Sequence, residues 1–305
     1  MYDIRFPHLG LTFHNVKTGF TIFGFEVKYY GLIIGLGFLL AYLWVAHEAK
    51  RTKQNPELYL DAFLWLVIPA IVGARIYYVL FNAKEYFAKG QGFWTTFKGI
   101  INIRNGGLAI YGGLIAGITV VILFARKRKV NIFLMLDTAS MGILIGQILG
   151  RWGNFFNREA FGEYTDSLFA MQIPTDFFVR HGSLRSMIEN GIITDKMAQN
   201  VVTYDTMQWI SVHPTFLYES LWNLVLFVFL FVYRKHKKFD GELILLYIWG
   251  YGLGRVWIEA LRSDSLMFFG TGLKVSQLLA MLCVVVASVI IVKKRLDYMR
   301  ENNQN

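Results

Sequence analysis

The fold is decided at residues 131–162, NIFLMLDTASMGILIGQILGRWGNFFNREAFG, where a long apolar segment gives way to a polar one. The apolar part is long enough to cross a bilayer as a helix. The polar part, Gly150–Gly162, sets two arginines, two asparagines and a glutamate among aromatic residues and three glycines. Charged and amide groups so close to hydrocarbon are costly unless they pair with one another or with a ligand. This stretch therefore predicts an anion site at a membrane surface.

The composition of the whole chain indicates a membrane protein. Of its 305 residues, 55% are hydrophobic and only 17% are charged, whereas soluble domains have about 45–50% apolar and about 25% charged residues. The net charge of +10 lies mostly at the ends of apolar runs. Charge placed there sets topology, so we expect no nucleic-acid partner. Cys283 is the single cysteine, so we expect no disulfide within this sequence.

Seven segments are apolar enough to cross a bilayer as helices, which takes about 20 residues each. The second, fourth and sixth of them also contain internal polar residues. The segments are Tyr29–Ala46, Leu60–Phe81, Gly107–Ala125, Asn131–Gly150, Pro214–Tyr233, Gly241–Leu261 and Val275–Val292. The sequence therefore predicts an all-α polytopic membrane protein with seven transmembrane helices.

Clusters of lysine and arginine give the expected orientation. They follow the first, third, fifth and seventh segments, and such clusters mark the cytoplasmic side of a membrane protein. The clusters begin at Lys50, Arg126, Arg234 and Lys293. We therefore expect the N-terminus outside and the C-terminus in the cytoplasm. Residues 1–20 lack a basic start followed by an apolar block, so we expect the first span to serve as an uncleaved targeting signal.

The longest connection between segments, Arg151–His213, is expected on the outer side. It is large enough for a small extracytoplasmic head, which we treat as an insertion at 151–213 in one membrane-embedded domain of residues 1–305. Within it we expect a helix at Phe177–Asn190 and a short strand at Ala170–Ile173. The connection Asn82–Gly106 is expected to be an outer loop.

Polar residues inside the apolar segments lie at similar depth. An α-helix rises 1.5 Å per residue, so Arg75, which follows Leu60 by 15 residues, is about 22 Å from the cytoplasmic end of its segment. Arg255, 14 residues beyond Gly241, is about 21 Å from the same side. Both therefore belong to the outer half of a hydrocarbon core about 30 Å thick. Further polar residues are expected in the same leaflet: Tyr30, Tyr111, Arg151, Asn154, Glu159, Tyr218 and Glu219.

The sixth segment carries Arg255, Glu259 and Arg262 at positions i, i+4 and i+7, which lie on one face of a helix. Glu259 can hold one arginine in place while another arginine faces a ligand. Planar guanidinium groups bind phosphate through two hydrogen bonds, which lysine cannot imitate. The alternative is an ion pair within the helix that offsets only its own insertion cost. The matching depth of Arg75 and Arg151 favours the ligand site.

Two shorter motifs each have a structural and a functional interpretation. The glycines of Gly106–Gly113 allow close contact between membrane helices, or they open an approach path for a lipid beside the hydroxyl of Tyr111. Because they flank Tyr111 at the expected outer surface, we favour the path for a lipid. His213 precedes Pro214, a residue that suits the first position of a helix. The histidine is then either a base or a donor at the helix end.

The chain resembles the prolipoprotein diacylglyceryl transferases along essentially its whole length. The run Gly150–Gly162 is similar to the signature of that family and is the most specific of the shared motifs. The other shared motifs are Tyr29-Tyr30-Gly31-Leu32, Gly73-Ala74-Arg75, Gly106–Gly113, His213-Pro214 with Tyr218-Glu219, and Gly250-Tyr251-Gly252 leading to Arg255, Glu259 and Arg262.

The resemblance implies a reaction, a place and partners. In that family the diacylglyceryl group of phosphatidylglycerol moves to the thiol of a lipobox cysteine in the signal peptide of a prolipoprotein, and glycerol 1-phosphate leaves. A bacterial plasma membrane protein with its active site at the outer leaflet is implied, surrounded by membrane lipid. The positions that the family uses correspond here to Tyr30, Arg151, Asn154, Gly162, Arg255 and Glu259.

The residues and this resemblance together give each side chain an expected role. We assign Arg151 and Arg255 to the phosphate, with Arg75 in support and Glu259 orienting an arginine, because fixed donors stabilise charge best where it develops. The other residues expected to contact the phospholipid are Tyr30, Asn154, Glu159, Gly162, Tyr218, Glu219 and Arg262.

The general base stays open at this stage. Tyr111 stands where some relatives have a histidine, and a tyrosine, with a reference pKa of about 10, is a poor base at neutral pH. The candidates are therefore Glu259, His213, an activated Tyr111 and water. No feature of the sequence calls for a metal or an organic cofactor. Two other functions are considered, an intramembrane anion transporter and a phospholipid-binding protein without catalysis. Against the transporter, the charges gather in one leaflet and no inverted repeat is evident.

Overall fold

The computed structural model of the chain describes residues 3–87, 92–103, 106–268 and 272–303. It divides into two compact units. Unit 1 comprises Met1–Trp44 and Ala139–Asn305, and unit 2 comprises Val45–Thr138. Two long helices, α1 (Tyr29–Arg51) and α6 (Ile132–Asn157), pass from one unit to the other.

Six helices of the described chain are long and apolar enough to cross a membrane. They are α1, α2 (Pro56–Phe81), α5 (Ile110–Arg128), α6, α10 (Thr215–Tyr233) and α12 (Val275–Asn303). The prediction of a mostly helical, multi-pass membrane protein is thus confirmed. The expected sixth segment also forms a helix, α11 (Glu242–Leu261), which contains Arg255 and Glu259 and is not among those six. The seventh span stays a prediction.

One helix boundary at the candidate site differs from the sequence-based expectation. We expected the fourth span to end at Gly150 and the outer connection to begin at Arg151. Instead α6 continues to Asn157, so Arg151 and Asn154 lie on the helix itself. The helix continues through this polar stretch because the side chain of Arg151 finds an ionic partner on a neighbouring helix.

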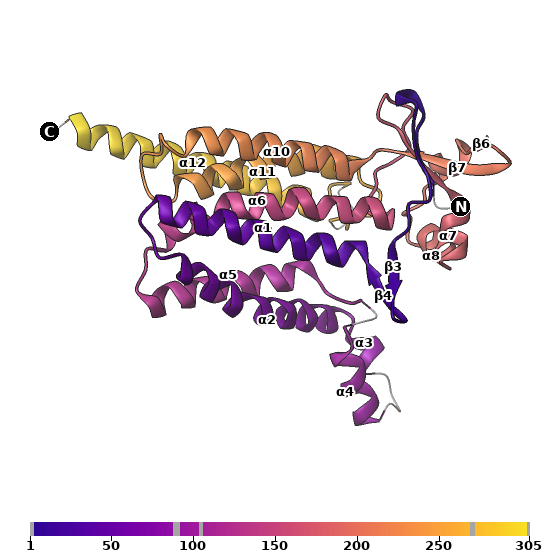
Figure 1. Cartoon of the computed structure of the whole chain (residues 1–305), viewed down its shortest axis with the longest axis horizontal. Helices are drawn as coiled ribbons and strands as arrows, with labels where there is room; N and C mark the ends of the chain where they lie inside the picture. Colours follow the sequence, from indigo (N-terminus) through magenta and orange to yellow (C-terminus); the bar gives the residue numbers. More distant parts are fainter. Residues whose placement is uncertain (1–2, 88–91, 104–105, 269–271, 304–305) are drawn as a thin grey trace. The chain divides into compact units, whose positions relative to one another are not determined.

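The bundle of unit 1 consists of α6, α10, α11 and α12 together with α1 up to Trp44. In it α10 lies beside α11, which lies beside α12 (Figure 1). Polar contacts tie the first three together: Ser220 on α10 donates to the carbonyl of Ile148 on α6 at 3.1 Å. Trp222 donates to the carbonyl of Gly250 on α11 at 2.9 Å. Further from the head, these helices share an apolar cluster. Its buried members are Met141, Leu144, Leu226, Leu230, Leu243 and Leu246.

The head of unit 1 is a five-stranded antiparallel sheet with the order β2-β1-β5-β7-β6. Its strands are β1 (Ile4–Phe6), β2 (Leu11–Phe13), β5 (Met171–Pro174), β6 (Val202–Tyr204) and β7 (Met207–Val212). A separate hairpin joins β3 (Gly19–Ile22) to β4 (Phe25–Lys28). The strand expected at Ala170–Ile173 is found as β5. The strands of the N-terminal arm were not predicted, because each is only three or four residues long.

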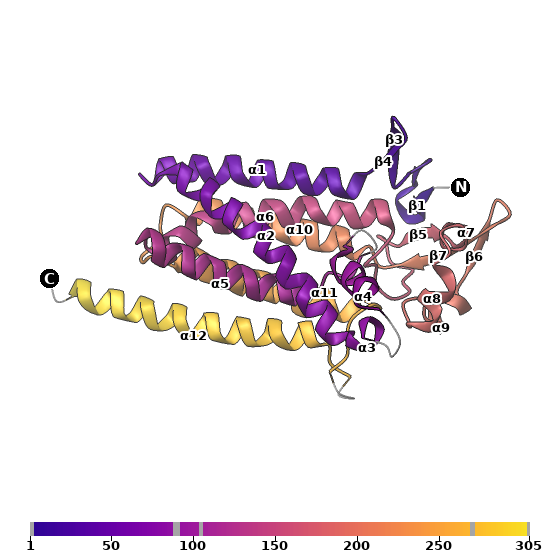
Figure 2. The same cartoon turned by 90° about the horizontal axis from the view of Figure 1, so that it is seen from below.

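The head also contains three short helices, α7 (Thr175–Arg180), α8 (Leu184–Glu189) and α9 (Asp195–Gln199), close to the sheet (Figure 2). The continuous helix expected at Phe177–Asn190 is wrong. The chain breaks it at Gly182, whose φ of +63° is unfavourable for other residues and cannot continue a helix. Phe155 of α6 and Phe216 of α10 enter the core of the head with Ile173 and Ile210, so the sheet is packed directly onto the ends of two bundle helices.

Unit 2 is built on α2 and α5, which pack closely through glycines. A β-carbon on Gly73 would lie 2.8 Å from the carbonyl oxygen of Gly112, and one on Gly112 would lie 2.3 Å from the carbonyl oxygen of Gly73. The structural interpretation of the Gly106–Gly113 motif is thus confirmed for Gly112. The connection expected as a loop at Asn82–Gly106 contains two short helices, α3 (Ala83–Tyr86) and α4 (Phe93–Ile101).

We predict that replacing Gly73 with valine separates α2 from α5. The new side chain meets backbone, which cannot move aside locally, so unfolding in detergent should become easier by about 1–3 kcal/mol. The measurement is thermal unfolding of the purified protein. Gly35→Val on α1 is the control, because nothing lies within 4 Å of a β-carbon at that position. Equal melting temperatures for the two variants would contradict the close packing.

Candidate active site

The centre of the candidate site is the carboxylate of Glu219, which binds arginines from two other helices. Arg151 on α6 approaches Oε1 of Glu219 to 2.7 Å, and Arg255 on α11 donates from Nη1 to Oε2 at 2.9 Å. Glu219 itself lies on α10, and its side chain is only 2% exposed. We call this arrangement of Arg151, Glu219 and Arg255 the Glu219 bridge. It brings together two guanidinium groups that are more than 100 residues apart in the sequence.

The glycine-rich run of α11 explains how Arg255 comes within reach of α10. A β-carbon on Gly250 would lie 2.5 Å from Leu226, and one on Gly254 would lie 2.3 Å from the indole of Trp222. On the other side, a β-carbon on Gly252 would lie 2.8 Å from Val284 of α12. The absence of side chains at these positions lets α11 lie close to both neighbours, so the arginine reaches Glu219.

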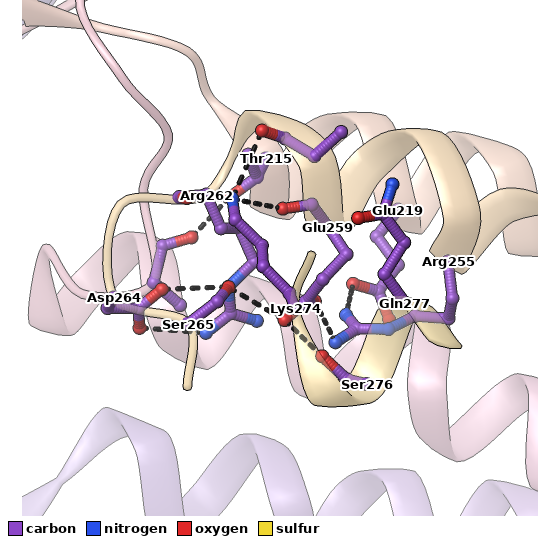
Figure 3. A network of polar contacts seen from close by, with 12 residues as sticks. Thr215, Glu219, Arg255, Glu259, Arg262, Asp264, Ser265, Lys274, Ser276 and Gln277 are labelled. Carbon is purple, nitrogen blue, oxygen red and sulfur yellow. Dashed lines mark hydrogen bonds and ion pairs between the residues drawn. The ribbon is translucent and has the colours of Figure 1, made fainter. Parts of the chain in front are cut away.

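Arg255 has a second carboxylate partner one turn further along α11. Its Nη2 donates to Oε2 of Glu259, while Oε1 of Glu259 accepts from the hydroxyls of Ser265, at 2.7 Å, and Ser276 (Figure 3). Glu259 is buried, with a side chain 4% exposed. Three donors thus hold this carboxylate in place, and Glu259 in turn orients the guanidinium of Arg255.

Lys274, which directly precedes α12, lies against the C-terminal end of α11. Its ammonium group donates to the carbonyls of Glu259 at 2.7 Å and Ala260 at 3.1 Å, and to the carbonyl of Arg262. Carbonyls at the end of a helix lack the usual donor four residues on, and that of Glu259 also accepts from the N–H of Arg262 at 3.1 Å. Burial lowers the pKa of Lys274, and the neighbouring carboxylates oppose that shift. Arg262 is held by Asp264 through two hydrogen bonds of 2.8 and 2.9 Å.

Asn154 and Glu159 form a second polar group at the end of α6. The amide of Asn154 donates to Oε1 of Glu159 at 3.0 Å, and its Oδ1 lies 3.5 Å from Nη1 of Arg151. Tyr30 packs over Gly153, where a β-carbon would lie 2.4 Å from its ring. Tyr30 and Glu159 also line a cavity of about 440 Å³. The chain of contacts from Glu159 through Asn154 thus reaches the Glu219 bridge.

Gly162 lies where three segments of unit 1 meet. Its N–H donates to the carbonyl of His213 at 2.9 Å, and the next residue, Glu163, donates to the carbonyl of Leu261 at 2.7 Å. A β-carbon on Gly162 would lie 2.7 Å from both His213 and the Leu261 carbonyl. We call these four residues the Gly162 junction. Gly162 therefore has a packing role, and a contact with phospholipid stays a prediction.

His213 and Tyr218 lie together beside this junction. Nδ1 of His213 is 3.4 Å from the hydroxyl of Tyr218, and both side chains are half-buried. Burial lowers the pKa of His213 and Lys196 lowers it further, whereas Glu163 raises it. The ring is therefore neutral at pH 7 and has the capacity to accept a proton.

Arg75 and Tyr111 belong to unit 2. Arg75 is 7% exposed, and it donates to four backbone carbonyls and one hydroxyl. Its acceptors are Gly99 at 2.7 Å, Ile100 at 2.6 Å, Gly106 at 3.0 Å, Gly107 at 2.8 Å and the hydroxyl of Tyr86 at 3.2 Å. These bonds use all five donor hydrogens of the guanidinium. Arg75 thus fastens the connection to α2, and the supporting role towards a phosphate stays a prediction, as does the role of Tyr111.

Several residues of this network had no expected role from the sequence. Tyr251 donates to Glu219 at 3.2 Å, and its position four residues before Arg255 on one helix face was the available signal. Ser265 and Lys274 lie in the connection to α12 and Ser276 lies in its first turn, and these residues gave no pattern of their own. Within the described ranges, no group of three or more histidine, cysteine, aspartate or glutamate side chains is arranged to hold a metal ion.

Comparison with known proteins places this geometry in a family. The family model described as prolipoprotein diacylglyceryl transferase matches residues 17–293. The chain belongs to that family. The match contains every residue of the Glu219 bridge and of the Gly162 junction.

Similar members of the prolipoprotein diacylglyceryl transferase family come from several bacteria. The phosphatidylglycerol–prolipoprotein diacylglyceryl transferase 1 of Clostridium perfringens is 38% identical over 275 residues, which covers 90% of this chain and 92% of that protein. The corresponding transferase of Finegoldia magna is 36% identical over 276 residues, 90% of this chain and 94% of that one. That of Bacillus cereus is 39% identical over 274 residues, 89% of each.

We predict that Glu219→Gln destabilises the protein strongly, because it leaves two largely buried guanidinium groups without their shared charge. The loss of one partner from a buried ion pair costs about 3–5 kcal/mol, which thermal unfolding in detergent will detect. An added anionic phospholipid should restore part of the loss. The control is Glu189→Gln, whose partner Arg185 is 91% exposed, and which should change stability by less than about 1 kcal/mol. If the Glu219 variant is as stable as this control, the Glu219 bridge does not hold the three helices together.

We also predict that His213 makes the protein less stable in acid. Its folded pKa lies below the unfolded value of about 6.5, so below that pH the unfolded chain takes up a proton that the folded chain resists. Stability is unaffected by this group at pH 7.5 and falls as the pH drops to 5.5. The melting temperature of His213→Gln should therefore decrease less over that range. An equal decrease in both proteins would show that His213 is not responsible.

Proposed function

We propose that this chain is a transferase that moves the diacylglyceryl group of phosphatidylglycerol to a prolipoprotein, at the thiol of a lipobox cysteine. The names of its relatives support the two substrates. The observation that carries the chemical part of the proposal is the Glu219 bridge. Two guanidinium groups meet there in a largely buried place, and the paired N–H donors of a guanidinium fit the oxygens of a phosphodiester.

The reaction needs a place that stabilises a departing phosphate ester. The cysteine sulfur forms a bond to the glycerol carbon that carries the phosphate, and the bond from that carbon to oxygen breaks with its electron pair on the oxygen. The thiol proton is released, and glycerol 1-phosphate departs. Arg151 and Arg255 stabilise the negative charge that grows on the leaving oxygen, and they are fixed before the reaction begins, which is what such catalysis requires.

The two carboxylates of the site position these arginines. Glu219 and Glu259 bind one N–H of each terminal nitrogen of Arg255, and a guanidinium has five donors in all. Further donors of Arg255 then serve the phosphate. Because Glu259 already accepts from Arg255, Ser265 and Ser276, we assign it to positioning rather than to proton removal.

The proton acceptor is then His213, Tyr111 or water. A free cysteine thiol has a pKa of about 8.5, and neighbouring arginines lower it, so a weak base suffices. His213 is the best of the side-chain candidates, since its ring is neutral at pH 7 and has Tyr218 beside it. Asn154 and Glu159, which are linked to the bridge through Arg151, are assigned to the headgroup of the lipid. So is Tyr30, which lines a cavity together with Glu159.

The proposed place of the protein is the bacterial plasma membrane, with seven spans and the site in the outer leaflet. The basic clusters at Lys50, Arg126, Arg234 and Lys293 support a cytoplasmic C-terminus. In support of α11 as the seventh span, Glu219 and Glu259 neutralise Arg255, so the charges of this helix do not enter hydrocarbon alone. The head then lies outside, where secreted precursors arrive.

We predict that Arg255→Lys lowers turnover by about 10²–10³-fold, because lysine keeps the charge and loses the two-pronged geometry. The assay mixes purified protein, phosphatidylglycerol and a lipobox peptide, and measures release of glycerol phosphate that depends on the peptide cysteine. Arg185→Lys in the head is the control, since Arg185 is 91% exposed and pairs only with Glu189 on its own helix turn among the described residues.

The same assay separates the proposed function from the two rivals. Release that depends on the peptide cysteine is transferase activity, whereas binding of lipid without release indicates a phospholipid-binding protein. A transporter would move an anion across a sealed vesicle in the absence of peptide. If Arg255→Lys turns over nearly as fast as the unaltered protein, the assignment of Arg255 to the phosphate is wrong.

A further inference from the structure

A second set of polar side chains lies one helical turn deeper in the bundle than the Glu219 bridge. The three helices that supply the bridge each supply one of them: Gln147 precedes Arg151 by four residues, Asn223 follows Glu219 by four, and Tyr247 precedes Tyr251 by four. Four residues are one turn, about 6 Å along the axis, and on each helix they lead away from the head. We call Gln147, Asn223 and Tyr247 the amide layer.

The packing of the helices brings these three residues to one level. The antiparallel pair α6 and α10 has Arg151 against Glu219 and Ile148 against Ser220, so one turn deeper Gln147 stands opposite Asn223. The amide of Gln147 donates to the hydroxyl of Tyr247 at 2.8 Å, which places α11 at the same level. The rings of Tyr247 and Tyr251 stack at 5.8 Å and connect this layer to the bridge above it.

The amide layer holds more hydrogen-bonding capacity than the described protein satisfies. Asn223 is fully buried, and neither Oδ1 nor Nδ2 has a partner among the described residues. Oε1 of Gln147 is likewise buried and without a partner there. Native proteins satisfy nearly all of their buried polar groups, and an exception indicates a ligand, a water or a functional role. A leucine at position 223 would avoid the cost of burying an amide without hydrogen-bond partners, but the residue there is an asparagine.

The position of the layer indicates what it binds. A diacylglycerophospholipid whose phosphate lies at Arg151 and Arg255 carries its two ester groups on the neighbouring glycerol carbons, which are further from the headgroup. These esters offer carbonyl oxygens, and carbonyl oxygens only accept hydrogen bonds. The layer has donors to match, in the amide of Asn223 and the hydroxyl of Tyr247.

We propose that the amide layer binds an ester carbonyl of the phospholipid and makes the protein selective for ester-linked over ether-linked lipid. This inference rests on the proposed function, since it takes the phosphate to be at the Glu219 bridge. Asn223 supplies the principal donor and the hydroxyl of Tyr247 a second one, while the amide of Gln147 holds that hydroxyl in place. The carbonyl is not attacked in the reaction, so this contact positions the glycerol carbon and takes no part in bond breaking.

The test compares phosphatidylglycerol with its diether analogue, which has the same headgroup and the same reacting carbon but no carbonyl. Turnover at low lipid concentration, kcat/KM, is measured for both lipids with the unaltered protein and with Asn223→Leu. We expect the substitution to lower kcat/KM by about tenfold for the diester lipid, the worth of one hydrogen bond, and to leave the diether lipid almost unchanged. The intrinsic reactivity of the two lipids cancels in this comparison.

The stability of the variant gives a second readout. Since the amide of Asn223 has no partner in the described protein, leucine of similar volume should keep or raise the melting temperature in the absence of lipid. The control is Leu226→Ala, on the same helix and in the apolar cluster next to the layer. It should lower the melting temperature and leave the ratio of the two lipids unchanged.

Several outcomes would overturn the inference. One is a loss of the same size for both lipids in Asn223→Leu, which would mean a structural role or a bound water alone. Another is a kcat/KM of that variant for the diester lipid equal to that of the unaltered protein. If Asn223→Leu does not fold, Gln147→Leu is measured in the same way, and an unchanged ratio there also overturns it. An unaltered protein with no activity on the diester lipid would instead refute the proposed function.

Discussion

The structure of unit 1 depends on one carboxylate shared by two arginines in a place that water barely reaches. A guanidinium carried alone into hydrocarbon is expensive, and a carboxylate carried alone is equally so. At Glu219 these costs offset each other, and the partners come from three different helices. The arrangement of α6, α10 and α11 is therefore specified by charge as well as by apolar packing. The glycines of α11 make these ion pairs sterically possible, because they let α11 lie close to its neighbouring helices.

The two units use buried arginine in different ways. Arg75 directs its guanidinium to backbone carbonyls and one hydroxyl, so it has an architectural effect on the connection before α5. Arg255 meets carboxylates and keeps further donors, so it has capacity for a ligand. An arginine inside a membrane protein is thus not by itself a sign of a binding site. The chemical nature of its acceptors distinguishes the two cases.

The long helices and part of the candidate site could be predicted from the sequence. The other features could not, and each has a physical reason. Apolar length predicted the long helices, and helix periodicity placed Arg255 and Glu259 on one face. The acceptors of Arg75 are main-chain atoms, which carry no sequence signal. Of the strands of the N-terminal arm, β1 pairs with a strand more than 150 residues away at Gln172. The others pair within the arm, and three or four residues are too few for a visible alternation. We expected Glu219 to contact the lipid, whereas it binds two arginines. A sequence does not distinguish a carboxylate that binds two arginines from one that faces a cavity.

The Gly162 junction has a mechanical consequence. Backbone hydrogen bonds link the loop after α6 to the last residues before α10 and to the end of α11, so the head is anchored to three helices at one point. Because of these bonds, a displacement of the head is transmitted directly to the helices that carry Arg151 and Arg255. The head and the helices of the Glu219 bridge therefore form one mechanical unit, and a force applied to the head acts on the spacing of the two arginines.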